Sequence, residues 1–394
     1  MQLKVKNKLY TNRILLFLLL ITVYSFITTK NDLTGDGLFS VNSLLKYGTL
    51  ILCIGSEGIA YYNRRQLTER ITLAKKFKNF AWYFLIILFL SAIKSIQEMH
   101  FSFRIIQTFI FVFFPMLYAF LVINTWKLEE IKFAFKVSLI ISFIGYIIST
   151  GISLPEIVSN LMAINYENTD STTLESSTFA LLALGFSGYF CYFKNGYFWK
   201  ILSVLFVVMT FKRQITLTAV SLLFLGFFSL RKRKVNKLYF VIACLLLIAF
   251  AFCYYYAIEP QNILNSSQLL GIDLRAFSTN RTDRLNWLSQ TTFQSYGFGS
   301  STDYMYNVFN GFALEMDTVQ LYVELGPLAV IFFIIYYLKF SNENIYVLLF
   351  MVLLIVNSIL SSGMASTFAW IIILIGMAAI MKTSESDVGA IEHE

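Results

Sequence analysis

Long apolar runs recur along this chain from Ile14 to Met381, and they constrain the fold more than any other feature of the sequence. The runs approach the roughly 20 residues that an α-helix needs to cross the hydrocarbon of a bilayer. They are continuously apolar, without the alternation of a β-strand, and inside a membrane only helices or closed barrels satisfy the backbone. We therefore expect an all-α polytopic membrane protein, with residues 1–394 forming a single integral-membrane domain.

The composition agrees with this class and excludes several others. The chain is 57% hydrophobic and only 14% charged, whereas a soluble chain carries about a quarter charged residues. The net charge of +8 comes from short basic segments between the apolar runs, which set topology rather than bind nucleic acid. The two histidines and four scattered cysteines suggest no metal site, and no phosphate-binding glycine motif is present. No cofactor is therefore expected.

Basic residues also predict which side of the membrane each segment faces. Residues 4–13, 63–79 and 231–234 are rich in Lys and Arg, which places them in the cytoplasm by the positive-inside rule. Residues 151–175 hold acids but no Lys or Arg, and are expected outside. The chain then makes about twelve crossings of the cytoplasmic membrane with both termini inside. The first run is expected to remain as a span, because no cleavable signal is evident.

The expected spans follow from these boundaries. They are residues 14–29, 41–62, 80–96, 104–124, 133–150, 176–193, 198–211, 214–230, 238–258, 317–338, 344–360 and 367–381. Between the ninth and tenth lies one large extracytoplasmic segment, residues 259–316, in which short helices are expected. Gly326-Pro327 predicts an irregularity inside the tenth span.

Three arginines stand in this outer loop, where basic residues are disfavoured: Arg275, Arg281 and Arg284. If Thr279 or Asn280 caps a helix, Arg281 and Arg284 become neighbours on one face. The planar fork of arginine binds phosphate oxygens in pairs, so we expect these side chains to hold a phosphate group. The alternative is that Asp273 and Asp283 pair with them in surface salt bridges of little energetic value.

Two further candidates extend this site. Arg213 lies between two apolar runs on the predicted outer side, where it either grips a lipid-linked phosphate or reaches outward with Lys212 to the head groups. Trp287 follows the arginines, and is either an interfacial anchor or a platform on which a sugar stacks.

Acidic residues follow directly after the loop. Asp317 and Glu324 lie seven residues apart on one helical face, and a carboxylate inside a membrane is a functional hypothesis by default. They would supply a general base and an orienting partner, with Glu315 just above them. Asp317 alternatively only caps the helix. Glu57 in the second span is expected to pair with Lys46 or with another span.

The order of these motifs resembles a known superfamily. An outer Arg281-x-x-Arg284-x-x-Trp287 is followed by Gly297-x-Gly299 and by Asp-Thr-Val-Gln-Leu-Tyr-Val-Glu from residue 317. This order, with Lys-Arg-Gln at 212–214, is similar to that of the O-antigen and capsular polysaccharide polymerases (Wzy-type) and O-antigen ligases. The match covers the topology and, more closely, residues 210–216 and 278–328.

The resemblance implies an enzyme, a glycosyltransferase that uses undecaprenyl-diphosphate-linked sugars on the outer face without a metal or a nucleotide sugar. Arg213, Arg275, Arg281 and Arg284 would bind the diphosphate, with Asp317 or Glu324 as the base. Ligases typically carry a histidine where this chain has Glu315-Met-Asp317, which favours a polymerase of capsule, exopolysaccharide or O-antigen. The implied partners are the lipid-linked oligosaccharide, membrane lipids, a chain-length regulator and a flippase of the same pathway.

Two alternatives stay open. A flippase or transporter for lipid-linked oligosaccharide would also need about twelve spans and cationic side chains. It would place its charges along a central path, whereas here the polar mass outside the membrane is concentrated in one late loop, which favours an enzyme. A ligase-type glycan transferase is the second alternative.

Overall fold

The structure is a computed structural model that describes residues 2–31, 41–65, 72–151, 176–193, 196–228, 233–309, 313–364 and 366–391. Within these ranges the regular elements are helices, and the one ladder contact is an isolated bridge between Lys234 and Asn344. The prediction of an all-α fold is confirmed for this part of the chain. Residues 152–175 of the predicted acidic loop, and Arg231 and Lys232 of the basic run, lie outside the described residues.

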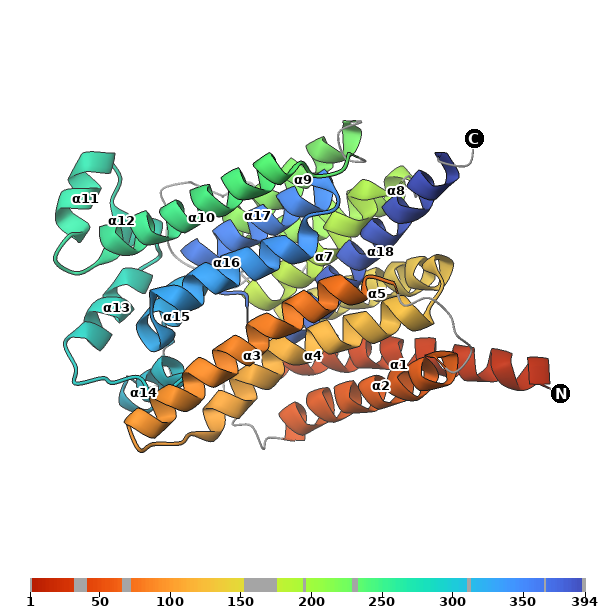
Figure 1. The fold of residues 1–394 in the computed structure, drawn as a ribbon, viewed down its shortest axis with the longest axis horizontal. Helices are drawn as coiled ribbons and strands as arrows, with labels where there is room; N and C mark the ends of the chain where they lie inside the picture. The colour runs from red at the N-terminus through yellow and green to blue at the C-terminus, as the bar shows by residue number, and fades with distance from the viewer. Residues whose placement is uncertain are drawn as a thin grey trace. The chain divides into compact units, whose positions relative to one another are not determined.

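Two compact units make up the chain. The first comprises residues 1–74, 114–228 and 367–394, and the second comprises residues 75–113 and 229–366. Helices of the first unit are α1 (Gln2–Asn31), α2 (Val41–Arg65), α5 (Leu128–Thr150), α7 (Ser177–Tyr192), α8 (Tyr197–Met209), α9 (Arg213–Phe227) and α18 (Thr367–Ile391) (Figure 1). The second unit includes α3 (Ala74–Gln97), α10 (Lys237–Ile258) and α17 (Ile345–Leu360), and α4 (Phe103–Thr125) has residues in both. The expectation of a single domain stays a prediction.

In the first unit, α1 packs against α2 and α5, and α7 packs against α8, α9 and α18. A Cβ atom on Gly145 of α5 would come within 2.8 Å of the Cβ of Ser25 on α1. Ser25 Oγ also donates a hydrogen bond to Ser142 Oγ of α5 at 3.3 Å. Small residues of this kind let helices approach closely, as is common between membrane helices.

Glu57 of α2 carries a buried ion pair in the same unit. Arg13 Nη1 of α1 donates to its Oε2 at 3.0 Å, and Trp126 Nε1 donates to its Oε1 at 2.8 Å. Thr125 Oγ1 donates to Oε2 as well, at 2.5 Å. Glu57 therefore pairs with another helix, which is one of the two arrangements that the sequence left open.

In the second unit, α10, α16 (Pro327–Ser341) and α17 pack together, and α3 joins α16 through aromatic side chains. The ring of Phe80 on α3 meets Tyr337 edge-on with 4.6 Å between centroids, and Phe77 meets Phe340 at 5.2 Å. Edge-to-face pairs of this kind stabilise a core beyond their buried area. They join segments far apart in the sequence and form the frame from which the late loop extends.

The described part of residues 259–316 contains α11 (Ile263–Leu270), α12 (Leu274–Phe277), α13 (Arg281–Ser289) and α14 (Ser300–Val308). The prediction of short helices in this loop is confirmed. The continuous helix expected over residues 317–338 is wrong, because α15 (Asp317–Leu325) and α16 replace it. Gly326 takes a φ of 84°, and Pro327 opens α16, where its missing N–H costs no helical hydrogen bond. The predicted irregularity is thus a complete break.

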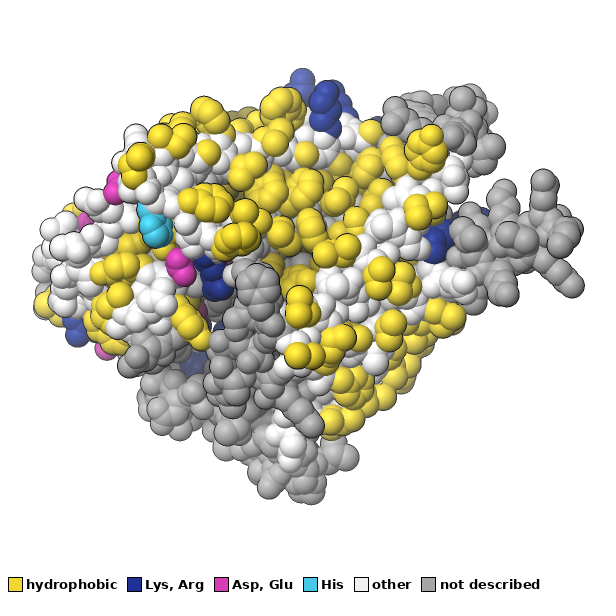
Figure 2. Space-filling model, turned by 90° about the horizontal axis from the view of Figure 1, so that it is seen from below, with side chains coloured by type: hydrophobic (Ala, Val, Ile, Leu, Met, Phe, Trp, Pro, Cys, Tyr) yellow, Lys and Arg dark blue, Asp and Glu magenta, His cyan; other side chains and the backbone are white. Residues whose placement is uncertain are grey.

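Four helices among the described residues, α3, α4, α5 and α10, are long and apolar enough to cross a membrane. Large apolar side chains on these helices are exposed, for example Phe89 on α3 and Leu246 on α10. Separately, Figure 2 shows a face of the molecule on which hydrophobic side chains predominate. The fold is compatible with a membrane protein. A single helix coincides with each of the eleven expected spans other than residues 317–338. The number of membrane crossings and their orientation stay predictions.

Candidate functional site

The candidate site is built on α13, whose start is set by two residues in the left-handed backbone region. Thr279 has a φ of 52° and Asn280 a φ of 60°, and asparagine tolerates this region better than most residues. Asn280 is the N-cap residue, so α13 begins at Arg281. The expected spacing is confirmed, since Arg281 and Arg284 are three residues apart on one helical face.

Both arginines reach the same carboxylate. Arg281 Nε lies 3.3 Å from Glu315 Oε2, and Arg284 Nη1 lies 3.0 Å from Glu315 Oε1. The arginine side chains are 11% and 17% exposed, whereas that of Glu315 is 42% exposed. Glu315 has a φ of 52°, an uncommon conformation for a glutamate. One accessible carboxylate therefore bridges two largely buried guanidinium groups.

Backbone carbonyls hold the two guanidinium groups in place. Arg281 Nη1 donates to the carbonyl oxygen of Ser278 at 3.2 Å, and Arg284 Nη1 donates to that of Ala313 at 2.8 Å. These contacts do not involve Glu315, so the positions of the arginines do not depend on it alone. A pair of cations fixed in this way is preorganised for an anion.

Asp317 lies two residues after Glu315 and is buried. Its Oδ2 accepts hydrogen bonds from the backbone N–H groups of Gly363 and Met364, each at 2.8 Å. The N–H of Asp317 donates to the carbonyl of Ser361 at 3.3 Å. This carboxylate ties the start of α15 to the segment that follows α17, an arrangement that favours an anchoring role. Its predicted catalytic role stays a prediction.

Glu324, near the other end of α15, is also buried. It accepts hydrogen bonds from the N–H of Gly299 at 2.6 Å, from the N–H of Ser301 at 2.8 Å and from Ser301 Oγ at 2.6 Å. Gln320 Nε2 adds a fourth donor at 3.1 Å. These donors come from the glycine turn, from α14 and from α15 itself, and together they fix the orientation of the carboxylate. Glu324 therefore fastens α14 to α15, and its catalytic role also stays a prediction.

The glycine turn at residues 297–301, which donates to Glu324, also packs tightly against α3 and α4. Gly297 and Gly299 have φ values of 134° and 93°. A Cβ on Gly299 would come within 2.5 Å of Thr108 Oγ1, and the N–H of Phe298 donates to Ser91 Oγ at 3.1 Å. The amides of this turn therefore face protein groups rather than an open phosphate site.

A polar cluster lies beside the turn. Tyr296 donates from its hydroxyl to Asp303 Oδ2 at 2.7 Å, and Ser102 Oγ donates to the same oxygen at 2.9 Å. Burial and the Asp303 carboxylate raise the pKa of Tyr296 well above its usual range, so the hydroxyl keeps the proton that it donates. The ring of His100 packs edge-on against Tyr296, with 4.3 Å between centroids. These contacts fix the loop to the turn between α3 and α4.

The other two candidate residues of the loop, Arg275 and Trp287, have contacts with residues other than Glu315. Arg275 Nε lies 3.7 Å from Asp283 Oδ1, and both side chains are exposed, so Asp283 makes with Arg275 the kind of surface pair that was the alternative for Arg281 and Arg284. Asp273 caps α12 through the N–H groups of Arg275 and Ala276. The indole of Trp287 stacks on Phe309, with 5.7 Å between centroids. The phosphate role of Arg275 and the sugar role of Trp287 stay predictions.

Arg213 is the first residue of α9, in the first unit. The turn before it is held by Tyr146 of α5, whose hydroxyl donates to the carbonyl of Met209, and by Ser176, whose N–H donates to the carbonyl of Thr210. Arg281 and Arg284 belong to the second unit. Cooperation of Arg213 with them therefore stays a prediction.

Sequence reasoning gave Glu315 too little weight. The sequence does indicate this residue, since Glu315 is an acid two residues before Asp317 at the end of an arginine-rich loop. Its pairing with residues 31 and 34 positions earlier depends on how the loop folds back. The contacts of the glycine turn with Ser91 and Thr108 had no signal in the sequence. Among the described residues, no group of three or more His, Cys, Asp or Glu side chains is placed to hold a metal ion.

The chemistry of this site has to be inferred from its own residues. No model of a known protein family matches the sequence, and neither curated proteins nor solved structures give a significant match.

Proposed function

We propose that this protein is a membrane glycosyltransferase that polymerises undecaprenyl-diphosphate-linked oligosaccharide units into a surface polysaccharide. The observation that carries the proposal is the convergence of Arg281 and Arg284 on Glu315. Two guanidinium groups that bridge one carboxylate are spaced to bridge the oxygens of a diphosphate. Supporting this, the pair sits in a loop between apolar helices, where a lipid-linked substrate would present its polar end.

The incoming diphosphate replaces Glu315 between the arginines. Arg281 and Arg284 keep their bonds to the carbonyls of Ser278 and Ala313 during this exchange. Their charges then stand where negative charge develops as the diphosphate leaves. Fixed cations of this kind stabilise a transition state without the cost of reorganising solvent.

In the reaction, the acceptor hydroxyl oxygen forms a bond to the anomeric carbon of the donor sugar. The bond from that carbon to the diphosphate oxygen breaks, and its electron pair leaves with the diphosphate. The hydroxyl proton moves to a carboxylate acting as general base. We assign that proton to Glu315, whose place between the arginines the diphosphate takes, because its side chain is accessible whereas Asp317 and Glu324 are buried.

In this proposal the loop lies on the outer face of the cytoplasmic membrane, with both termini in the cytoplasm. The donor sugar is carried on a lipid diphosphate, so no nucleotide sugar is required, and the resemblance implies that no metal is required. A flippase that delivers the units and a regulator of chain length are the expected partners.

The test is to replace Arg281 or Arg284 by alanine in the producing cells and to separate the surface polysaccharide on a gel. We expect single repeat units at the surface instead of long chains. A transporter would instead leave no units outside when the same residues are lost. Lys237→Ala, which removes an exposed cation at the start of α10, is the matched control and should leave chain length unchanged. Normal chain length in both arginine variants at normal protein levels would exclude the site.

A further inference from the structure

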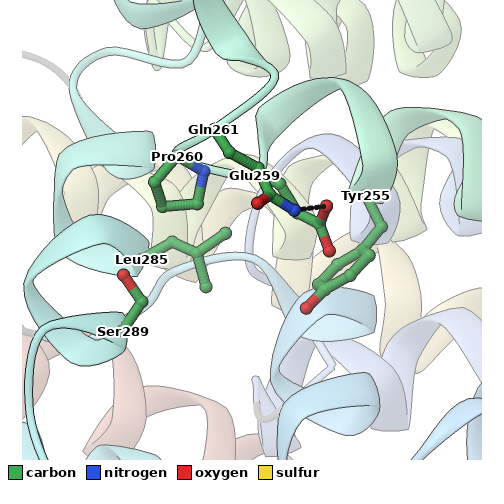
Figure 3. Close-up of a pocket in the computed structure, with 6 residues that line it drawn as sticks. All are labelled: Tyr255, Glu259, Pro260, Gln261, Leu285 and Ser289. Carbon is green, nitrogen blue, oxygen red and sulfur yellow. Dashed lines mark hydrogen bonds between the residues drawn. The ribbon is translucent and has the colours of Figure 1, made fainter.

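A pocket of about 290 Å³ opens between the C-terminal end of α10, the turn that follows it and α13 (Figure 3). It lies at the lower end of the range of ligand pockets, about 300–1,000 Å³, and so suits a single ring better than a long chain. Six residues line it: Tyr255, Glu259, Pro260, Gln261, Leu285 and Ser289. None of them has a part in the diphosphate site proposed above.

The lining combines apolar surfaces with a few polar groups. The rings of Tyr255 and Pro260 and the side chain of Leu285 provide the apolar walls, and Figure 3 shows them around the same hollow. Glu259, Gln261 and Ser289 supply the polar atoms. A sugar ring presents apolar C–H faces and a rim of hydroxyl groups, and a mostly apolar pocket with a few placed polar groups is the usual form of a small-molecule site.

The carboxylate of Glu259 is oriented by its neighbours. Gln261 Nε2 donates to Oε2 at 3.2 Å, and Asn262 Nδ2 donates to the same oxygen at 3.0 Å. Within the described part of the chain, Oε1 accepts no hydrogen bond, which leaves it for the hydroxyl of a ligand. A carboxylate at this place repels anions, and a long isoprenoid tail would leave it desolvated without a donor.

The pocket adjoins the arginine pair through shared elements. Leu285 follows Arg284 in α13 and lies one turn after Arg281. The ring of Tyr255 packs on Tyr322 of α15, with 3.9 Å between centroids. A ligand in the pocket would therefore lie next to a diphosphate held by α13.

We propose that this pocket binds a neutral, hydroxyl-rich sugar ring of the acceptor chain, next to the donor diphosphate. The role of this sugar as the acceptor rests on the proposed function, whereas the pocket and the chemistry of its lining do not. Binding of a sugar here would orient the acceptor hydroxyl towards Glu315.

The test uses the full-length protein in detergent and two separate probes. The first is an oligosaccharide fraction of one to three repeat units, prepared by partial acid hydrolysis of the polysaccharide of the producing cells. The second is farnesyl diphosphate. We expect Glu259→Gln and Ser289→Trp each to weaken oligosaccharide binding by about tenfold or more. The first variant replaces a charged hydrogen-bond acceptor by a neutral amide, and the second fills the pocket with an indole ring. Neither change should weaken farnesyl diphosphate binding.

Gln290→Trp, at the next exposed position of the same helix end, is the matched control and should bind both probes normally. Unchanged oligosaccharide binding in Glu259→Gln and Ser289→Trp would overturn the pocket assignment. So would loss of farnesyl diphosphate binding in these variants, since the pocket would then hold the isoprenoid. Arg281→Ala and Arg284→Ala should show the opposite pattern. If they bind farnesyl diphosphate normally, the proposed function fails while the pocket result remains interpretable.

Discussion

Glu324 on α15 accepts a hydrogen bond from the backbone N–H of Gly299, 2.6 Å away, and thereby closes the N-terminus of α14. Gly299 has no side chain with which to cap that helix, so the carboxyl group of Glu324 on α15 replaces the missing cap. A carboxylate at a helix N-terminus also interacts favourably with the helix dipole. This contact joins the loop to the end of α15, just before the break at Gly326.

Glu324→Gln should therefore destabilise the protein. Glutamine offers an acceptor oxygen at only one end of its amide, while the N–H groups of Gly299 and Ser301 bind both ends of the carboxylate. We expect a loss of about 1–3 kcal/mol in the free energy of unfolding, measured by denaturant titration in mixed micelles. Glu98→Gln, at an exposed position after α3, is the control, and equal stability of the two variants would contradict the capping role.

Gly299→Ala should cost more than Gly271→Ala, although both glycines have a positive φ. At Gly271 a Cβ meets nothing within 4 Å, whereas at Gly299 it would come within 2.5 Å of Thr108 Oγ1. Backbone strain alone costs about 1–3 kcal/mol at either site, so the difference measures the clash. Thermal unfolding of both variants is the measurement. Thr108→Ala should restore part of the stability of Gly299→Ala, and no rescue would argue against the contact.

Arg284→Lys should lower the rate of polymerisation, whereas Arg275→Ala should not. Lysine keeps the charge but cannot make the paired bonds of a guanidinium group, and loss of one fixed donor typically costs on the order of 10²-fold in rate. Arg275 pairs instead with Asp283 at the surface. Rates are measured as incorporation of radiolabelled repeat units in membrane vesicles. A large loss in Arg275→Ala would return this residue to the diphosphate site.

Glu315→Gln should separate binding from turnover. The variant removes the carboxylate that competes for the arginines, so inorganic pyrophosphate should bind several-fold more tightly, on the order of three- to tenfold. It also removes the proposed base, so turnover should fall roughly 10²–10⁴-fold. Calorimetry with pyrophosphate and the vesicle assay give the two values. Weaker pyrophosphate binding would show that Glu315 organises the arginines instead of occupying them.

Glu57→Gln should destabilise the first unit through its buried ion pair. The change leaves Arg13 with an uncharged partner, and breaking such a pair costs about 3–5 kcal/mol. Replacing both residues by methionine should cost clearly less, because no charge is then left buried. Unfolding of the single and double variants in micelles makes the comparison. A double variant as unstable as Glu57→Gln would assign the loss to packing instead.

The helices were predictable because apolar length alone specifies them. Each expected span coincides with a helix or, at residues 317–338, with two. The break there was signalled by Gly326-Pro327, but its completeness was not, because proline is tolerated inside membrane helices when neighbours satisfy the backbone. Such neighbours are known only once the chain has folded.

The site was predictable only where it is local. Arg281 and Arg284 share a helical face, and that follows from their spacing. Their carboxylate partner does not, because Glu315 reaches them through a left-handed backbone and a return of the loop. Asp317 and Glu324 drew attention as acids beside a span. Their partners include backbone N–H groups, which every residue except proline carries and no sequence pattern marks.

Glu315 also gives the arginine pair a threshold for its ligands. The carboxylate of Glu315 is tethered within reach of both guanidinium groups, so a free monovalent anion has to displace it in order to bind either of them. In the proposed function a diphosphate would engage both guanidinium groups at once and so displace the carboxylate from both. The pair would then select its ligands by the number of charges that they carry together.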